Sequence, residues 1–210
     1  MVLILGRTSQ DRGNEFEDFT VYLLENLLSF HVIQKRWKHS FREIDILAED
    51  FFKRKYIIEC KEFRMSRKCV SPVDVDNLVI RVIKHEEAKT GVIMTTGKIS
   101  EGAYQNALLL RTRLEDLNID VSLTDGEQLS QIYMKEAKIL KSDAKQIANK
   151  NGLIGRLEVE LGYFYGKPCW VVLLKQGRLI KDLMGIDARK GVIVNIEDHV
   201  PSKLGGKASS

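Results

Sequence analysis

The fold of this chain is decided by residues 41–63, FREIDILAEDFFKRKYIIECKEF. Its parts are a first alternating run, a charged turn and a second alternating run, at 41–48, 49–54 and 55–63. Successive side chains of a strand point to opposite faces, so Glu59 and Lys61 share one face of the second run. If the two strands pair through the turn, Asp45 of the first run lies near both of them.

A helix before these strands adds a third carboxylate. Residues 14–29 have the apolar spacing of an amphipathic helix, and Asn14 is the expected N-cap. Glu17 falls in register with Leu24 and Leu28, on the inward side, where a carboxylate is unusual. Neighbouring carboxylates repel each other and burial makes each costlier, so a cation normally holds such a cluster together.

The chemistry of this cluster suits a hard divalent cation. Mg²⁺ takes oxygen ligands and keeps several waters. A lysine beside such a site, here Lys61, orients or deprotonates a water or stabilises charge on a phosphate. The arrangement therefore predicts metal-assisted phosphodiester hydrolysis.

A purely structural role explains the same pattern. Asp45, Glu59 and Lys61 would then form a cross-strand salt bridge. Acid-x-Lys also occurs on charged helical stretches, where a solvated face is the simplest explanation, at 87–89, 136–138 and 143–145. Only Glu59-Cys60-Lys61 ends an apolar β-run, and the pattern alone leaves catalysis and structure both open.

The remaining pattern predicts an α/β fold in which helices flank a central mixed sheet. The further elements of this core are expected at 31–37, 73–86, 91–96, 100–115, 119–123 and 127–149. After Asn151-Gly152 only β patterns follow, at roughly 153–160, 169–175, 178–183 and 191–196. We therefore expect a core domain, a small β-rich appendage and a disordered tail, at 1–150, 151–198 and 199–210.

Composition excludes several classes of protein. Of the 210 residues 44% are hydrophobic and 30% are charged, which is typical of a globular chain. No apolar run approaches the roughly 20 residues that span a bilayer, and MVLILGRTSQ lacks the features of a secretory signal. We therefore expect a cytoplasmic protein with no membrane partner. Three cysteines without a C-x-x-C pair favour neither a disulfide framework nor a thiolate zinc site.

Charge points to a polyanion. Between His31 and Lys68 eleven basic residues face six acidic ones, a net charge of +5, which suits nucleic acid but also a solvated basic face. The candidate nucleic-acid contacts are Arg36, Lys38, Arg64, Arg67, Lys68 and Lys98. Trp37, between the first two, is more simply explained as a core residue at a strand end. Around Lys98, GVIMTTGKI departs from the phosphate-loop spacing, so no nucleotide cofactor is expected.

Five segments together resemble the Mrr-type branch of the PD-(D/E)XK nucleases. They are GNEFE at 13–17, EIDIL at 43–47, IECK at 58–61, TTGKISEGA at 95–103 and VSLTDGEQL at 121–129. The resemblance covers about 13–134 in the right order, which makes it far more specific than the acid-x-Lys pattern. The region after residue 135 has no counterpart in the family, so the resemblance does not reach target preference.

The resemblance implies a restriction-endonuclease-like fold that cuts DNA with Mg²⁺, for which Mn²⁺ substitutes. Asp45 and Glu59 would be metal ligands, Lys61 the catalytic lysine and Glu17 the helical acid near the metal. The family often has Gln at the position of Glu59, whereas this chain follows the broader superfamily and keeps the metal site intact.

We therefore expect a Mg²⁺-dependent DNA endonuclease. Cutting both strands of a duplex needs two active sites, so we also expect a homodimer; a monomer mass at every concentration would count against it. Alternative functions on the same fold are those of a branched-DNA resolvase, a repair nuclease or an RNA nuclease. A non-catalytic DNA-binding module is the remaining alternative, and the intact Asp45, Glu59 and Lys61 argue against it.

Overall fold

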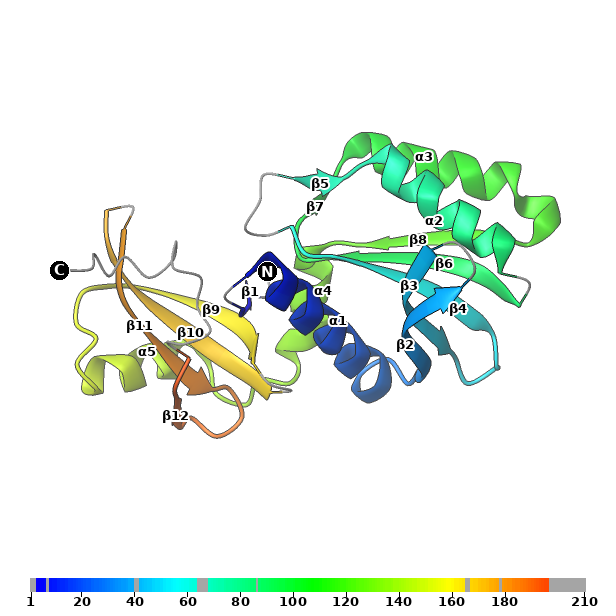
Figure 1. The fold of residues 1–210 in the computed structure, drawn as a ribbon. Helices are drawn as coiled ribbons and strands as arrows, with labels where there is room; N and C mark the ends of the chain where they lie inside the picture. The colour runs from blue at the N-terminus through cyan, green and yellow to red at the C-terminus, as the bar shows by residue number, and fades with distance from the viewer. Residues whose placement is uncertain are drawn as a thin grey trace. The chain divides into compact units, whose positions relative to one another are not determined.

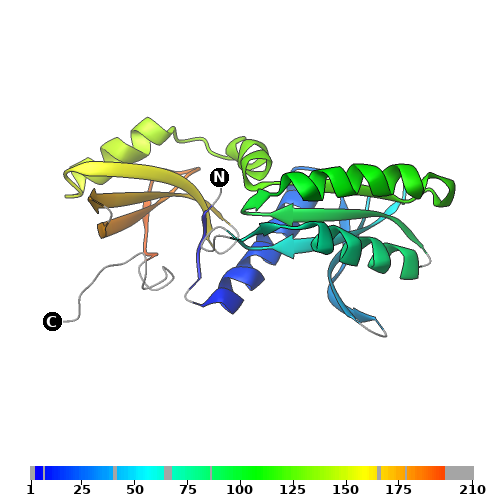
Figure 2. The same cartoon turned by 90° about the horizontal axis from the view of Figure 1, so that it is seen from above.

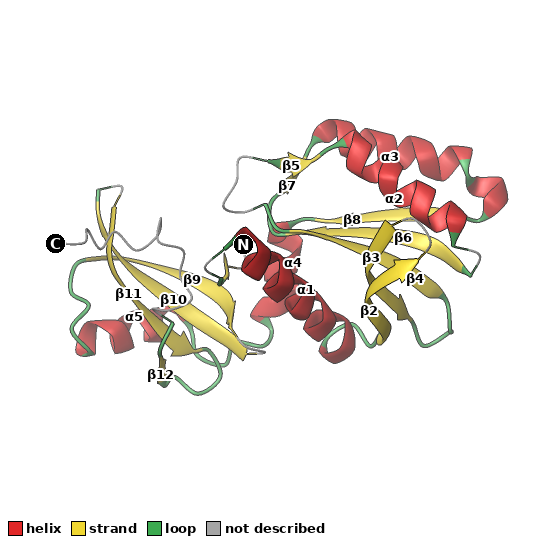
Figure 3. Cartoon of the chain, in the orientation of Figure 1, coloured by secondary structure: helices red, strands yellow, loops and turns green. Residues whose placement is uncertain are grey.

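The computed structural model describes residues 3–6, 8–39, 42–63, 68–85, 87–164, 167–177 and 179–196. Helices and strands alternate along the first two thirds of the chain, and strands dominate the last third (Figures 1 and 3). The elements are β1 (Leu3–Ile4), α1 (Ser9–Asn26), β2 (His31–His39), β3 (Arg42–Glu49), β4 (Lys55–Lys61), β5 (Cys69–Val70), α2 (Pro72–Lys84), β6 (Ala88–Thr95), β7 (Lys98–Ile99), α3 (Glu101–Arg113), η1 (Glu115–Leu117), β8 (Asp120–Thr124), α4 (Gly126–Met134), α5 (Lys141–Lys150), β9 (Arg156–Phe164), β10 (Lys167–Gln176), β11 (Leu179–Asp187) and β12 (Ile193–Val194).

The chain forms two compact units. The central unit is Phe16–Leu129, and the terminal unit joins Met1–Glu15 to Ser130–Ser210. This division differs from the boundary expected after residue 150. It differs because β1 pairs in parallel with β9 and because α5 packs on β9 and β10, so both segments join the C-terminal strands.

The central unit is built on a mixed five-stranded sheet in the order β2-β3-β4-β6-β8. The pairs β2–β3 and β3–β4 are antiparallel, and β4–β6 and β6–β8 are parallel. The parallel strands are joined through α2 and α3, as the helix-crossover pattern of the sequence predicts. The expected α/β architecture with a central mixed sheet is confirmed.

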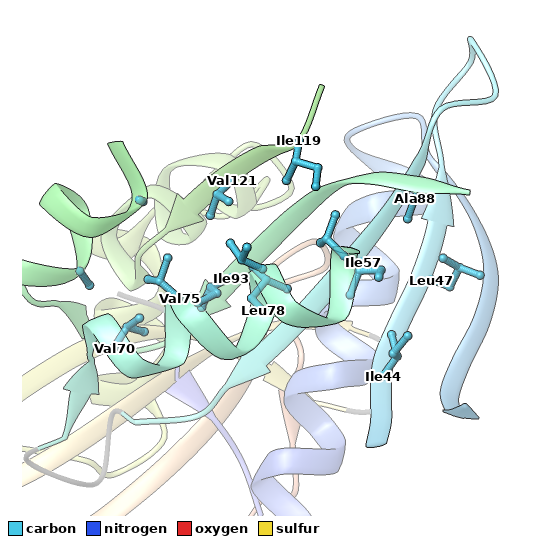
Figure 4. Close-up of a cluster of buried hydrophobic side chains, with 14 residues drawn as sticks. Ile44, Leu47, Ile57, Val70, Val75, Leu78, Ala88, Ile93, Ile119 and Val121 are labelled. Atoms are coloured by element: carbon cyan, nitrogen blue, oxygen red, sulfur yellow. The ribbon is translucent and has the colours of Figure 1, made fainter. Parts of the chain in front are cut away.

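Helices cover both faces of this sheet. Figure 1 shows α2 and α3 over one face, and Figure 2 shows the same layers from above. The hydrophobic core between these two helices and the sheet includes Ile57, Leu78 and Ile93, none of them more than 1% exposed (Figure 4). On the other face, the Cys60 thiol lies 3.5 Å from the Thr20 hydroxyl of α1.

A glycine allows α2 to sit close to the sheet. Gly91 lies on β6 opposite Ile57 of β4. A Cβ at this position would lie 2.7 Å from Cγ of Leu78 and 2.9 Å from Cγ2 of Val82, both on α2. The helix therefore rests on the bare backbone of β6, and this contact fixes its distance from β4.

Two helices differ from the sequence expectation. Helix α1 begins at Ser9 instead of near Asn14, because the side chains of Thr8 and Asp11 each accept a hydrogen bond from the other's backbone N–H. The single helix expected over 127–149 is two helices, α4 and α5. The backbone N–H groups of Lys138 and Ile139, between them, both donate to the carbonyl of Ala188, which replaces helical bonds there.

The terminal unit is a second five-stranded sheet, in the order β1-β9-β10-β11-β12. Its central strand β10 buries side chains on both faces, including Val171 and Val172. Trp170 is buried, and its indole N–H donates to the carbonyl of Ile139 at 2.8 Å. Among the helices that the structure describes, none is long and apolar enough to cross a membrane.

The seating of α2 on Gly91 gives a testable stability effect. We expect Gly91→Ala to lower the free energy of unfolding by about 1–3 kcal/mol, because the added methyl group overlaps Leu78 and Val82. Urea denaturation measures the change. Gly13→Ala is the control: nothing lies within 4 Å of that Cβ, so it is expected to stabilise α1 by about 0.5–1 kcal/mol. An unchanged stability of Gly91→Ala would contradict the close seating.

Candidate active site

The site begins where β3 and β4 stop pairing. Their last paired residues are Ile46 and Ile58, and Asp45 and Glu59 are the next residues on each strand. Beyond this point the side chain of Asp45 replaces the ladder, since its Oδ2 accepts a 2.7 Å hydrogen bond from the backbone N–H of Cys60. The carboxylate of Asp45 is therefore held at the end of the strand pair.

Glu59 is a buried carboxylate between two cations. Its residue is 6% exposed. Lys61 Nζ lies 2.7 Å from Oε1 of Glu59, and the guanidinium of Arg81 from α2 is paired with Oε2. A buried charge needs such partners, because removing a carboxylate from water costs several kcal/mol.

Helix α2 reaches the site at two positions two turns apart. Asp74 and Arg81 lie on one face of the helix, with buried Leu78 between them. Oδ1 of Asp74 lies 3.9 Å from Nζ of Lys61. The other oxygen of Asp74 is held in a capping box, accepting from the backbone N–H of Ser71 at 2.8 Å and from its hydroxyl at 2.7 Å.

Two buried threonines hold the backbone that carries Lys61. The hydroxyl of Thr95 donates to the carbonyl of Lys61 at 2.7 Å, and the backbone N–H of Thr96 donates to the same carbonyl at 3.2 Å. The hydroxyl of Thr96 accepts from the backbone N–H of Phe63 at 3.1 Å. The threonine pair that carries part of the family resemblance thus fixes the end of β4.

Glu17 of α1 lies beside a different set of cations. Its Oε2 is 2.6 Å from Nε of Arg36 and 3.7 Å from Nζ of Lys35. Arg36 has a positive φ of 52°, an uncommon conformation for a residue with a side chain, at the strand position facing Asp45. Lys35 also pairs with Asp18, so α1 and β2 are joined by an ionic network.

Burial is the main influence on the pKa values of the two carboxylates Asp45 and Glu17. The pKa of Asp45 is raised chiefly by burial, against the opposing effects of the Cys60 hydrogen bond and of the Arg81 and Lys61 charges. The pKa of Glu17 is also raised, first by burial, while the hydrogen bond from Arg36 lowers it and the charge of Asp45 raises it. A further positive charge near either acid would therefore stabilise its ionised form.

The donor set fits a hard cation, although no metal-binding group is already assembled. Within the described ranges, no three histidine, cysteine, aspartate or glutamate side chains converge to hold a metal ion. Asp45 and Glu59 nevertheless offer carboxylate oxygens at neighbouring strand ends, and the Cys60 bond uses only one oxygen of Asp45. Glu17 lies in the Arg36 and Lys35 network rather than against Glu59.

The basic candidates lie on several elements. Lys68 and Lys98 are exposed. Lys98 lies on β7, paired with Cys69 of β5, and Lys68 is the residue directly before β5. Arg36 is held by Glu17. The remaining candidates lie outside what the structure describes: Arg64 and Arg67 entirely, and Lys38 in its side chain.

Sequence reasoning missed Arg81 and Asp74. A signal was present, because Asp74, Leu78 and Arg81 follow helical spacing and place a charged residue beside an apolar stripe. It was not sufficient, because only the packing of α2 on β6 brings that face of the helix to β4. The cross-strand salt bridge considered as a structural alternative is replaced by two other contacts: Glu59 pairs with Lys61 within β4, and Asp45 accepts from the backbone N–H of Cys60.

The sequence belongs to a known nuclease class. Residues 9–133 match the model of the Mrr catalytic domain family, described as restriction endonuclease, which covers more than half of the chain. The chain therefore belongs to the restriction endonuclease family of the Mrr type, and its restriction-endonuclease-like fold is confirmed. A catalytic domain of this family is a nuclease domain.

Solved structures resemble the chain only distantly. A repair endonuclease from Pyrococcus abyssi matches with 13% identity and a TM-score of 0.38, over 53% of this chain and 46% of that one. The EndoMS–dsDNA2 complex matches with 12% identity and a TM-score of 0.37, over 60% and 48%. The chain thus spans less than half the length of either structure. No curated protein matches the sequence.

The raised pKa of Asp45 predicts a pH-dependent cost to stability. The folded protein holds this proton more tightly than the unfolded chain, so stability falls as pH rises above the ordinary aspartate pKa of about 3.9 and through the raised value. We expect Asp45→Asn to be more stable than the native chain at pH 7. The gain should disappear below about pH 3.9, where the acid is protonated in both states.

Urea denaturation in EDTA at pH 7 and at about pH 3.5 measures this difference. Asp116→Asn, at an exposed acid of η1, is the control and should change little at either pH. Equal stability of Asp45→Asn and the native chain at pH 7 would mean that the carboxylate carries no burial cost.

Proposed function

We propose that this chain is a Mg²⁺-dependent DNA endonuclease, with Mn²⁺ as a substitute, that hydrolyses phosphodiester bonds at Asp45, Glu59 and Lys61. One observation carries the proposal. In a member of a nuclease family, the parting ends of β3 and β4 put a half-buried aspartate next to a buried glutamate that already holds a lysine. Neighbouring carboxylates are seldom buried unless a cation binds to them.

Asp45 and Glu59 would hold the divalent cation. When bound, that cation supplies Lewis-acid stabilisation of the charge that builds up on the scissile phosphate. The Asp45 carboxylate is already oriented by the N–H of Cys60, and Glu59 is oriented by its two cationic partners.

Lys61 would position the attacking water and the phosphate. Its ammonium group is held 2.7 Å from Glu59 by a backbone that Thr95 and Thr96 fix, so its three N–H donors are aimed by the fold. A compact charge of this kind can hold a water and a phosphate oxygen together. Glu17 of α1 would act as an acid near Asp45, whose charge raises the pKa of Glu17.

Basic side chains would bind the DNA backbone. β5 and β7 are the next strands after the ends of β4 and of β6, and Lys61 pairs with Thr95 at those ends, so Lys68 and Lys98 come after the strand ends that carry the site. Arg36 lies next to Glu17 on the β2 side of the site. Lys38, Arg64 and Arg67 would extend these contacts, and a homodimer would supply the second site that duplex cleavage needs.

Plasmid nicking tests the catalytic proposal. We expect the protein to nick supercoiled plasmid with Mg²⁺ or Mn²⁺ and to lose this activity in chelator. Asp45→Ala and Lys61→Ala should each reduce the rate at least about 100-fold, since each removes a charge at the reacting phosphate. Lys55→Ala is the matched control, because Lys55 lies on the same face of β4 at its other end, paired with Glu87.

The substrate panel separates the alternatives. Duplex, junction, flap and RNA substrates are compared at equal concentration, and we expect cleavage of duplex DNA. Preference for junctions or flaps would replace the duplex endonuclease by a structure-specific one. Binding of DNA without cleavage of any substrate would overturn the enzyme and leave a binding module.

The DNA contacts predict a specific salt dependence. Lys68→Gln and Lys98→Gln should each weaken binding to all DNA sequences alike and reduce the slope of log affinity against log salt by about 1. Fluorescence anisotropy with Ca²⁺ measures binding. Lys89→Gln, at an exposed lysine near the other end of β6, is the control. An unchanged slope in both variants would remove these lysines from the DNA interface.

A further inference from the structure

We infer that Arg81 of α2 is a positioning residue that holds Glu59 in the orientation in which it binds the divalent cation, and that Asp74 orients the ammonium group of Lys61, which binds water and phosphate. This inference rests on the proposed metal-dependent function and adds to it a part of the site that the strands do not contain. Two residues on one helix face would thus each orient one residue of the acid-x-Lys pair.

The contact between Arg81 and Glu59 is largely shielded from solvent. The side chain of Glu59 is 8% exposed and that of Arg81 is 17% exposed. Inside a protein an arginine is retained next to a carboxylate because its planar fork fixes the direction of the carboxylate as well as its charge. Arg81 pairs with Oε2 and Lys61 with Oε1, so both oxygens of Glu59 are fixed.

The two cationic contacts leave Glu59 able to bind a metal ion. An ionised carboxylate has about four lone-pair sites, and one ion pair at each oxygen leaves about half of them for a metal ion. Partners of this kind commonly orient carboxylate ligands of metals, and their loss typically costs about 10–100-fold in metal affinity. The neighbouring Asp45 adds a reason. Asp45 and Glu59 are the next residues after the last β3–β4 pair, so a cation beside Glu59 offsets the repulsion between two neighbouring carboxylates.

The position of Arg81 is set by packing and not by its own flexibility. Leu78, one turn before Arg81, sits on the bare backbone of Gly91, and Gly91 is paired with Ile57 of β4. Glu59 is two residues further along that strand. The distance from the helix to the glutamate is therefore fixed by a contact in which the Leu78 side chain packs directly on the backbone of β6.

Asp74 completes the arrangement at the helix start. Its capping box with Ser71 fixes one carboxylate oxygen, and the other faces Lys61 at 3.9 Å. The ammonium of Lys61 therefore lies near two acids, 2.7 Å from Glu59 and 3.9 Å from Asp74. The two acids hold the ammonium group of Lys61 in one place. Because Asp74 shares its charge, Lys61 does not fully neutralise Glu59.

Binding of Mn²⁺ alone, without DNA, tests the role of Arg81. Isothermal titration calorimetry is run on the full chain as the native protein, Arg81→Met, Arg81→Lys and Asp45→Asn. We expect Arg81→Met to weaken Mn²⁺ binding by about 10–100-fold. Arg81→Lys, which keeps the charge and loses the fork, should recover part of the affinity. Arg111→Met is the matched control, since it removes a helical arginine, on α3, that pairs with an acid on a strand, Asp120 of β8.

A second readout separates positioning from catalysis. The cleavage defect of Arg81→Met should shrink as Mn²⁺ is raised to saturation, whereas that of Lys61→Ala should persist at every concentration. Circular dichroism establishes that each variant is folded. If Arg81→Met does not fold, Arg81→Lys carries the test alone, and it should bind Mn²⁺ more weakly than the native protein.

The outcomes distinguish this inference from the proposed function. Native-like Mn²⁺ affinity in both Arg81 variants, with binding that depends on Asp45, would overturn the positioning role and leave the metal site standing. Tighter binding in Arg81→Met would also overturn it, because the arginine would then compete with the metal. A native protein that binds no Mn²⁺ would overturn the proposed function itself.

Discussion

The structure of the central unit depends on one buried carboxylate. Glu59 lies at the end of an apolar strand, where an ionised side chain costs several kcal/mol unless cations meet it. One cation, Lys61, comes from two residues further along the same strand, and the other, Arg81, comes from α2. The helix can supply that charge only because Gly91 lets it lie against the sheet. Strand pairing, helix seating and site geometry are therefore parts of one arrangement.

Much of this site could be predicted from local sequence. Alternation along two strands places Asp45, Glu59 and Lys61 together, and the structure ends the β3–β4 ladder at that point. Arg81 could not be placed in the same way, because its contact depends on how closely α2 approaches β4. Glu17 was correctly expected to face inward, but its Arg36 and Lys35 partners depend on a left-handed residue within β2, which periodicity does not reveal.

The division of the chain shows a different limit of sequence reasoning. A two-residue strand, Leu3–Ile4, pairs with β9 more than 150 residues away, and no local pattern encodes a partner at that distance. The expected helix over 127–149 breaks for the same reason, because Lys138 and Ile139 bond to a carbonyl of a distant turn. Local periodicity thus predicts the elements of the central unit well, and it fails where the terminal unit is assembled from both ends of the chain.

The central claim is that Asp45 and Glu59 form a binding site for a divalent cation. Diffraction from crystals grown with Mn²⁺, recorded at the manganese absorption edge, tests it most directly. The account predicts an anomalous peak within bonding distance of a carboxylate oxygen from each of these two residues, with Arg81 still paired to Glu59. Full occupancy of Mn²⁺ elsewhere in the chain with none between Asp45 and Glu59 would contradict it.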